Sequence, residues 1–327
     1  MELYLGVDIG SVSSNFVLSN GQGEVLASVY LRTMGNPVQA VRDGLARLAK
    51  EFPGTRVKGV GTTGSGRQLA ATMLGADVVK NEITCHAIAA YQYNPEVRTV
   101  IEIGGQDSKI IIIRDGIVVD FAMNTVCAAG TGSFLDQQAA RLNIPIQEFG
   151  QKALAARQSA RIAGRCGVFA ESDMIHKQQM GYPVEDIIAG LCEALARNFL
   201  NNVGKGKDIQ EPVMFQGGVA ANVGLKQAFE KLLGKPVIVP QYHSVMGAVG
   251  AALLARETVA EKGRPTNFKG MDYVLDGHFT TRSFECQGCP NLCEVVSIKR
   301  GGEVLAYWGD RCRRWETSLS SDCRALA

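Results

Sequence analysis

The feature that most constrains the fold is a short pattern of strands and turns that occurs twice. The first copy has apolar strands at residues 3–8, 15–18 and 25–31 and a helix from Pro37. The second copy has strands at residues 98–103, 108–114 and 117–122 and a helix after Cys127. In both copies a glycine-rich turn follows the first strand. Two copies of one such motif predict a duplicated α/β fold.

The repeat and the composition together predict the domain organisation. With 327 residues, of which 46% are apolar, the chain is long enough for two domains and a small appendage. We expect a first half at residues 1–95, completed by about 245–260, and a second half at residues 96–244. A polar linker is expected at residues 257–283 and a cysteine-rich tail at residues 284–327.

Charge, hydropathy and cysteine usage narrow the class of protein. The 34 basic and 32 acidic residues leave a net charge of +2, so no nucleic-acid partner is predicted. No apolar run approaches the roughly 20 residues that span a bilayer, so no membrane segment is predicted. Nine cysteines, with no leader before the first strand, favour metal or redox chemistry in the cytoplasm over a disulfide framework.

Three glycine-rich turns each follow an apolar strand, and they point to a nucleotide. Their sequences are VDIGS at residues 7–11, IGGQD at 103–107 and FQGGVA at 215–220. A glycine turn after a strand lets backbone N–H groups approach phosphate oxygens. A carboxylate beside the turn, such as Asp8, can reach a magnesium ion that keeps most of its waters. One such turn is commonly an ordinary β-turn, but three in this order are much more specific.

Two cysteines precede helical runs. Cys127 is followed by Gly130 and Gly132, which allow a tight turn, and then by a helical pattern. We expect Thr131 and Ser133 to cap free N–H groups at the start of that helix. Cys166 precedes a second helical run in the same way. A thiol at the positive end of a helix dipole favours a thiolate and an anionic ligand.

These motifs resemble the superfamily of actin, the heat-shock chaperones and the sugar kinases. GVDIGS and IEIGGQDSK are similar to its two phosphate loops, and FQGGVA is similar to its adenosine motif. The segments NEITCHA, VCAAGTGSFLDQQA, GRCGVFAESDMI and GGVAAN sharpen the resemblance to the activator ATPases of 2-hydroxyacyl-CoA dehydratases and benzoyl-CoA reductases, the BadF/BadG/BcrA/BcrD type. The resemblance covers roughly residues 3–256 and implies an actin-like fold of two RNase H-like domains. Glu102 departs from it, since the superfamily usually has Asp there.

The resemblance implies a site for ATP or ADP with Mg²⁺ in a cleft between the two halves. The residues it assigns to the nucleotide are Gly10, Ser11, Ser13, Gly104, Gly105, Gly217, Gly218 and Ala220. Asp8 is expected to orient the magnesium ion through water. Gln106, Asp107 and Glu82 are candidates for positioning the attacking water, with Glu171 a weaker one. The sequence does not rank these side chains.

The resemblance also assigns Cys127 and Cys166 to a [4Fe–4S] cluster shared by a homodimer. Two cysteines per chain cannot fill the four ligand positions, so a symmetric dimer completes the site. ATP hydrolysis would rotate the halves and gate a low-potential electron. The electron would pass from a donor such as ferredoxin or flavodoxin to an acyl-CoA dehydratase or reductase partner. Cys85 and Cys192 are expected to be buried core thiols.

The tail carries its own group of cysteines. Cys286, Cys289 and Cys293 precede a predicted hairpin, and Cys312 follows it. This grouping favours a small zinc or Fe–S site, because so short a tail has little core of its own, with free thiols as the alternative. Cys323 is expected to bind nothing. A similar segment joins the activator half to further domains in larger activator-like proteins, so the chain also resembles a fragment or a relative of these fusions.

Two other functions would use the same fold. A sugar-type kinase would share the ATP cleft, but it would need a catalytic aspartate at a sugar pocket and would not need Cys127 and Cys166. A metal or redox sensor would combine the ATPase with the tail. A brown, oxygen-sensitive protein would favour electron transfer over both.

Overall fold

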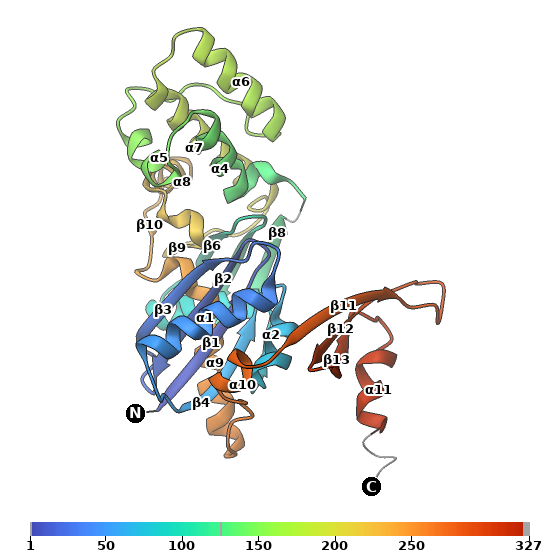
Figure 1. Ribbon diagram of the computed structural model, residues 1–327. Coiled ribbons are helices and arrows are strands. Elements are labelled where there is room, and N and C mark those ends of the chain that lie inside the picture. The colour runs from blue at the N-terminus through green and yellow to red at the C-terminus, as the bar shows by residue number, and fades with distance from the viewer. Residues whose placement is uncertain (1, 125, 323–327) are drawn as a thin grey trace. The chain divides into compact units, whose positions relative to one another are not determined.

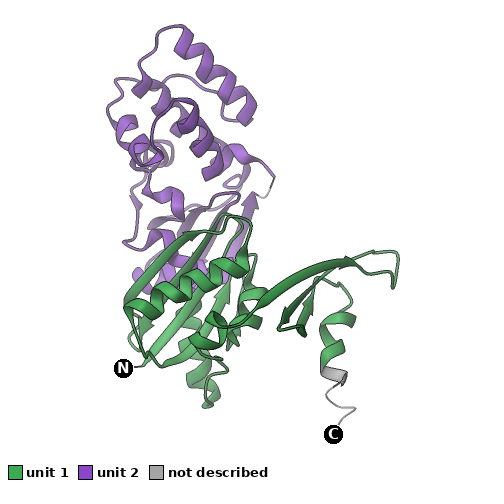
Figure 2. Ribbon diagram, viewed as in Figure 1, with its two compact units in different colours: residues 1–81, 251–327 green, residues 82–250 purple. Residues whose placement is uncertain are grey.

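The computed structural model describes residues 2–124 and 126–322. It divides into two compact units, each with its own five-stranded sheet (Figure 2). Unit 1 contains residues 1–81 and 251–327, and unit 2 contains residues 82–250. Cys323, which was expected to bind nothing, lies outside the described residues.

Unit 1 is built on a sheet with the strand order β3-β2-β1-β4-β5. Its strands are β1 (Leu3–Ile9), β2 (Ser13–Asn20), β3 (Val25–Arg32), β4 (Val57–Thr63) and β5 (Val78–Val79). The first three are antiparallel neighbours, and β4 runs parallel to β1. Its first two helices are α1 (Pro37–Glu51), which lies across the sheet (Figure 1), and α2 (Arg67–Leu74). Helix α1 begins where the Asn36 side chain accepts from the backbone N–H of Gln39.

Unit 2 repeats this sheet, with the order β10-β9-β6-β7-β8. Its strands are β6 (Thr99–Ile103), β7 (Ser108–Arg114), β8 (Ile117–Asn124), β9 (Val213–Gln216) and β10 (Val237–Ile238). Again the first three are antiparallel neighbours, and β9 runs parallel to β6. The duplicated α/β fold is therefore confirmed, because both sheets place equivalent strands in equivalent positions.

The helices of unit 2 surround one apolar core. They are α3 (Glu82–Tyr93), α4 (Gly132–Arg141), α5 (Ile146–Leu154), α6 (Gly167–Gln179), α7 (Val184–Asn202) and α8 (Val223–Leu233), with short 3₁₀ turns η1 (Ala128–Gly130), η2 (Gly218–Ala221) and η3 (His243–Val245). Helices α4 to α8 are grouped together (Figure 1). Helix α7 packs against α5, α6 and α8. Its Phe199 meets Phe229 edge to face, and Phe229 meets Phe215 of β9 in the same way.

Helix α9 (Met246–Lys262) is rich in small residues and approaches other backbone closely, as the sequence predicts. In unit 2, a Cβ added at Gly250 would lie 1.9 Å from the carbonyl oxygen of Cys85. In unit 1, a Cβ added at Gly61 of β4 would lie 2.0 Å from the carbonyl oxygen of Ala251. Only glycine fits at these two contacts, since real Cβ atoms do not come so near a backbone atom.

The chain after α9 folds onto unit 1. It forms α10 (Met271–Leu275), a three-stranded sheet of β11 (Phe279–Glu285), β12 (Glu294–Arg300) and β13 (Glu303–Trp308), and α11 (Arg314–Asp322). Val274, Phe279 and Ile298 are buried in the core of unit 1. The range 257–283, which we expected to be a polar linker, thus contains the end of α9, all of α10 and most of β11. The reason is that Val274 and Phe279 are buried in this core and other apolar side chains of the range pack partly against it.

Within the described residues, no helix is both long enough and apolar enough to cross a membrane.

Candidate functional site

The first and second glycine turns, one in each unit, are closed by the same backbone hydrogen bond. In unit 1 the Gly10 N–H donates to the Ser13 carbonyl at 2.8 Å, and in unit 2 the Gly104 N–H donates to the Asp107 carbonyl at 3.0 Å. Asp8 occupies the position in β1 that Glu102 occupies in β6, two residues before the glycine. The carboxylates that precede the turns are therefore equivalent in the duplication.

The residues opposite these carboxylates are also equivalent. Asp8 is paired with Asn15 of β2 and Thr63 of β4. Glu102 is paired with Lys109 of β7 and Gln216 of β9. In each unit the acidic residue thus lies between two residues that are not acidic, one on each neighbouring strand.

Against each turn lies another glycine, and this one has a positive φ. A Cβ added at Gly64 (φ 88°) would lie 2.4 Å from the Ile9 carbonyl oxygen and 2.5 Å from Asp8 Oδ1. A Cβ added at Gly217 (φ 91°) would lie 2.2 Å from the Ile103 carbonyl oxygen and 2.8 Å from Glu102 Oε1. The sequence singled out Gly217 as part of the adenosine-like motif, and its nucleotide contact stays a prediction. Gly64 was not singled out, although it also follows an apolar strand.

Sequence reasoning also missed Lys109, whose ammonium group is buried among three carboxylates. Its Nζ lies 2.7 Å from Glu82 Oε2, 2.8 Å from Glu102 Oε2 and 2.9 Å from Asp107 Oδ1. Only 2% of the side chain is exposed. Burial alone would lower the pKa of Lys109, but the carboxylates outweigh it, so that the pKa is raised and the ammonium stays charged. The four charges form one ionic cluster.

This ionic cluster bears on the candidates for positioning the attacking water. Glu82 and Asp107 are both bound to Lys109, and burial together with the nearby Glu102 raises the pKa of Asp107. Gln106 is exposed at the tip of the turn. Glu171 belongs elsewhere, since it pairs with Arg141 at 2.7 Å. The structure therefore brings Glu82 and Asp107 together and separates Glu171 from the ionic cluster.

The adenosine-like motif is held to the residues around it by hydrogen bonds. The Gly217 N–H donates to the His243 carbonyl at 2.8 Å. One residue earlier, Gln216 Oε1 lies 2.7 Å from the Nδ1 atom of buried His86. Gly218 and Ala220 follow in the 3₁₀ turn η2. Each of these contacts lies within unit 2.

The Cys127 segment corrects one expectation. Thr131 and Ser133 do not cap α4, because their hydroxyls donate instead to the carbonyls of Ala128 (2.8 Å) and Gly105 (2.5 Å). The N–H groups of Gly132 and Ser133 donate to the carbonyls of Gly104 and Gly105, both at 2.9 Å. The carbonyl groups of the second glycine turn thus accept the hydrogen bonds of the first N–H groups of α4. Cys127 itself precedes η1, and Thr131 stands between that turn and α4.

Cys166 lies directly before α6, as predicted, and its segment and that of Cys127 share a contact. Asn198 of α7 connects them, since its Nδ2 lies 3.9 Å from Cys127 Sγ and 3.3 Å from the carbonyl oxygen of Arg165. Both thiols are half-buried. Thiolate sulfur is the ligand that an Fe–S cluster requires, so the two side chains are of the right chemical kind for one. Cys85 and Cys192 are buried, and burial raises the pKa of Cys192 to about 12.

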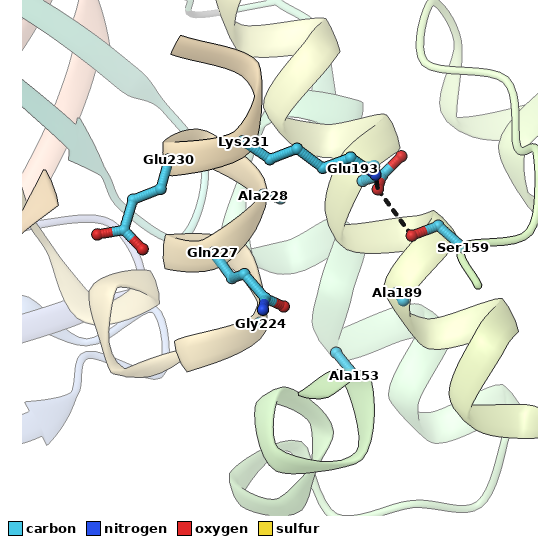
Figure 3. Close-up of a pocket in the computed structure, with 9 residues that line it drawn as sticks. All are labelled: Ala153, Ser159, Ala189, Glu193, Gly224, Gln227, Ala228, Glu230 and Lys231. Carbon is cyan, nitrogen blue, oxygen red and sulfur yellow. Dashed lines mark hydrogen bonds and ion pairs between the residues drawn. The ribbon is translucent and has the colours of Figure 1, made fainter. Parts of the chain in front are cut away.

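A separate cavity of about 360 Å³ lies among α5, α7 and α8 (Figure 3). Its floor consists of small residues, and Glu193 accepts hydrogen bonds from the Ser159 hydroxyl at 2.7 Å and the Lys231 ammonium at 2.6 Å. These partners lower the pKa of Glu193 against the opposing effect of burial. None of the site residues predicted from the sequence lines this cavity.

The tail cysteines are not assembled around a common centre. Across the described parts of the chain, no three His, Cys, Asp or Glu side chains are grouped so that they could hold a metal ion. Cys286 is buried, and its sulfur accepts from the indole N–H of Trp315 at 3.3 Å and from the Gly288 N–H at 3.4 Å, which lowers its pKa. Cys289 and Cys312 are exposed. The described residues thus show no assembled metal site here, and a site at Cys286, Cys289, Cys293 and Cys312 stays a prediction.

The duplicated sheets and their glycine turns define an actin-like ATPase. The chain belongs to the BadF/BadG/BcrA/BcrD ATPase family, whose pattern matches residues 5–255. That range includes all three glycine turns, Cys127 and Cys166, whereas the tail lies beyond it.

Individual relatives agree with this assignment. The chain is 35% identical over 263 residues to the 2-hydroxyisocaproyl-CoA dehydratase activator of Clostridioides difficile, covering 79% of this chain and 96% of that one. It is 35% identical to the (R)-2-hydroxyglutaryl-CoA dehydratase activating ATPase of Acidaminococcus fermentans, covering 80% and 100%. The solved structure of the Clostridium difficile activator, with bound ADPNP, superposes with a TM-score of 0.73 at 32% identity over 80% of this chain and 97% of that one.

Proposed function

We propose that this protein is an ATP-hydrolysing activator that delivers a low-potential electron to an acyl-CoA dehydratase or a benzoyl-CoA reductase-like partner. Relatives that are 35% identical have the names of dehydratase activators, and a benzoyl-CoA reductase subunit of Thauera aromatica is 28% identical. The observation that carries the proposal is the direct hydrogen bonding between the Gly104-Gly105 turn and the start of α4, next to Cys127.

The glycine turns bind the phosphates in this proposal. The residues assigned to the phosphates are Gly10, Ser11 and Ser13 of the first turn and Gly104 and Gly105 of the second, and those assigned to the adenosine are Gly217, Gly218 and Ala220. Magnesium, held by Asp8 through water, would neutralise charge on the phosphates. Around Asp8, the side-chain oxygens of Asn15 and Thr63 are buried and form no hydrogen bond among the described residues. Unpartnered polar atoms of this kind suit a hydrated ion or a phosphate.

Three polar side chains of unit 2 have different roles in positioning the attacking water. Gln106 is exposed at the tip of the turn and can hold the attacking water there. Asp107 and Glu82 share Lys109 and so fix the base of the turn. Positioning of this kind dominates phosphoryl transfer, because the reaction needs little covalent help from the protein.

A shift of the second turn is transmitted to the Cys127 thiol through the first residues of α4. The carbonyls of Gly104 and Gly105 accept three hydrogen bonds from Gly132 and Ser133. If loss of the γ-phosphate moves the turn, the start of α4 moves with it. Cys127 lies only a few residues before this point, so its surroundings change with the nucleotide.

Cys127 and Cys166 are the proposed ligands of a [4Fe–4S] cluster, with a second copy of the chain supplying the other two. A bound cluster would supply the one-electron carrier, and a ferredoxin or flavodoxin would reduce it. The apolar side chains beside the thiols support a dimer. Val126 is 95% exposed, Val168 71% and Phe169 65%, as expected for side chains that another protein covers.

The test is anaerobic purification of the wild type, Cys127→Ala and the control Cys192→Ala. Wild type and control should be brown dimers with about four iron atoms per dimer, and both should support ATP-dependent reduction of a dehydratase partner. Cys127→Ala should lose the iron and the electron transfer but still bind ATP, because Cys127 is not in a glycine turn. Electron transfer at an unchanged rate in Cys127→Ala would refute the proposal. A colourless wild type that phosphorylates a sugar would favour the kinase alternative.

A further inference from the structure

Asn198 has an unusual position for an amide in the core of unit 2. It lies on α7 between apolar residues such as Leu195 and Phe199, and only 1% of it is exposed. Burying an amide is costly unless its hydrogen bonds are satisfied. Its contacts therefore show what the residue does in this fold.

The amide group bonds to both cysteine segments at once. Nδ2 donates to the carbonyls of Gly164 at 2.7 Å and Arg165 at 3.3 Å, which immediately precede Cys166. The same nitrogen lies 3.9 Å from Cys127 Sγ. The amide oxygen accepts from Asn202 Nδ2 at 3.1 Å. Asn198 thus holds the backbone before one thiol and faces the sulfur of the other.

The Cys127 segment is shaped to receive this amide. A Cβ added at Gly130 would lie 2.8 Å from Asn198 Oδ1 and 3.1 Å from Asn124 Nδ2. Asn124 in turn donates to the Cys127 carbonyl at 2.8 Å and accepts from the Cys127 N–H at 2.9 Å. Gly130 therefore lets two asparagines approach the same turn, one that holds the Cys127 backbone and one that faces its sulfur.

We propose that Asn198 is a positioning residue, which fixes the spacing of Cys127 and Cys166 and donates a hydrogen bond to the Cys127 sulfur. The assignment of these thiols to a cluster rests on the proposed function. An N–H donor stabilises the added negative charge of a reduced centre, so Asn198 would raise the reduction potential of a cluster held there. In the metal-free protein it would restrict the motion of both thiols.

The first test needs no metal. The metal-free wild type, Asn198→Ala and the control Asn202→Ala are alkylated with iodoacetamide under argon, and the modification of each cysteine is followed by mass spectrometry. Asn198→Ala removes the donor without adding a charge beside the thiols. Cys127 and Cys166 should then react about fivefold faster, the factor expected for loss of one hydrogen bond. Asn202→Ala should react like the wild type, because it leaves the contacts of Nδ2 in place.

The second test is made on protein reconstituted with iron and sulfide. The potential of Asn198→Ala should be more negative than that of the wild type, with a changed EPR spectrum. Asn198→Ser serves the same purpose if Asn198→Ala does not fold. Unchanged alkylation rates and an unchanged potential in a folded variant would overturn this inference and leave the proposed function intact. A wild type that binds no iron would overturn the proposed function, and the alkylation rates would still decide whether Asn198 holds the two segments.

Discussion

The glycine turns of the two units share a backbone and differ in charge. Around Asp8 in unit 1 the paired residues are the neutral Asn15 and Thr63, whose oxygens form no hydrogen bond among the described residues. Around Glu102 in unit 2 the corresponding position holds Lys109, which binds three carboxylates. Duplication has preserved the geometry and changed the chemistry. Unit 1 leaves two buried polar atoms without a hydrogen bond among the described residues, whereas unit 2 uses its charges to fix its own turn.

The largest effect is expected from removing the buried cation. Lys109→Met should lower the free energy of unfolding by about 3–5 kcal/mol, because three carboxylates are left without a partner. The equivalent change in unit 1, Asn15→Leu, should cost about 1 kcal/mol or less, because the Asn15 oxygen has no hydrogen bond to lose. Urea denaturation of both variants measures the difference. Equal losses would mean that the two turns are alike in energy as well as in shape.

The pH dependence of the same pair separates charge from packing. In the wild type the pKa of Lys109 is raised above its ordinary value of 10.5, so its contribution is complete at neutral pH and is lost only as the pH rises above that value. In Lys109→Met the carboxylates repel one another, and protonation relieves the repulsion. The deficit of Lys109→Met relative to the wild type should therefore shrink as the pH falls below about 5. A deficit that does not vary with pH would point to packing alone.

The next largest effect is expected at the glycine with a positive φ that lies against the turn in each unit. Gly64→Ala and Gly217→Ala should each destabilise by about 2–4 kcal/mol, because both combine a positive φ with a close carbonyl oxygen. Gly54, with a φ of 68° and open space around it, is the control, and Gly54→Ala should cost about 1 kcal/mol. Thermal unfolding would rank the three variants. A mild effect at only one of the two turn glycines would break the equivalence of the units.

The smallest effect tests the connection to the thiol. Ser133 Oγ donates to the Gly105 carbonyl in unit 2, and Thr33 Oγ1 donates to the Gly10 carbonyl at 2.8 Å in unit 1. Ser133→Ala and Thr33→Val should each cost about 1 kcal/mol. Only Ser133→Ala should change how nucleotide affects the alkylation of Cys127, since only Ser133 lies in the segment that follows this thiol. The same response in both variants would argue against transmission through α4.

Much of the fold was predictable, because it follows from local pattern. Apolar strands, glycine turns and helical periods repeat in order along the chain, and the two sheets have the topology that this repeat implies. The thiol before α6 was also predictable from the small residues around Cys166. In each case the signal lies within a few consecutive residues.

The rest depends on contacts between distant segments. Lys109 lies in an apolar strand, and nothing near it in the sequence indicates that Glu82 and Glu102 will both reach its ammonium group. Asn198 likewise has the sequence context of an ordinary helical residue. Thr131 and Ser133 suit helix caps by residue type, but carbonyls from residues 104 and 105 are available to the N–H groups and change the outcome.

The segment that follows α9 has a consequence for anyone who wishes to transplant this ATPase. Thr266 and Asn267 bind the Asp77 carboxylate at 2.6 and 2.8 Å, and Lys269 binds the Leu74 carbonyl at 2.9 Å. Shortening the chain to residues 5–255, the range that the family pattern matches, would expose apolar side chains of α2 and remove two of the hydrogen bonds to the Asp77 carboxylate. The sequence after α9 is thus part of the core of unit 1, and a transferable version of the enzyme has to include it.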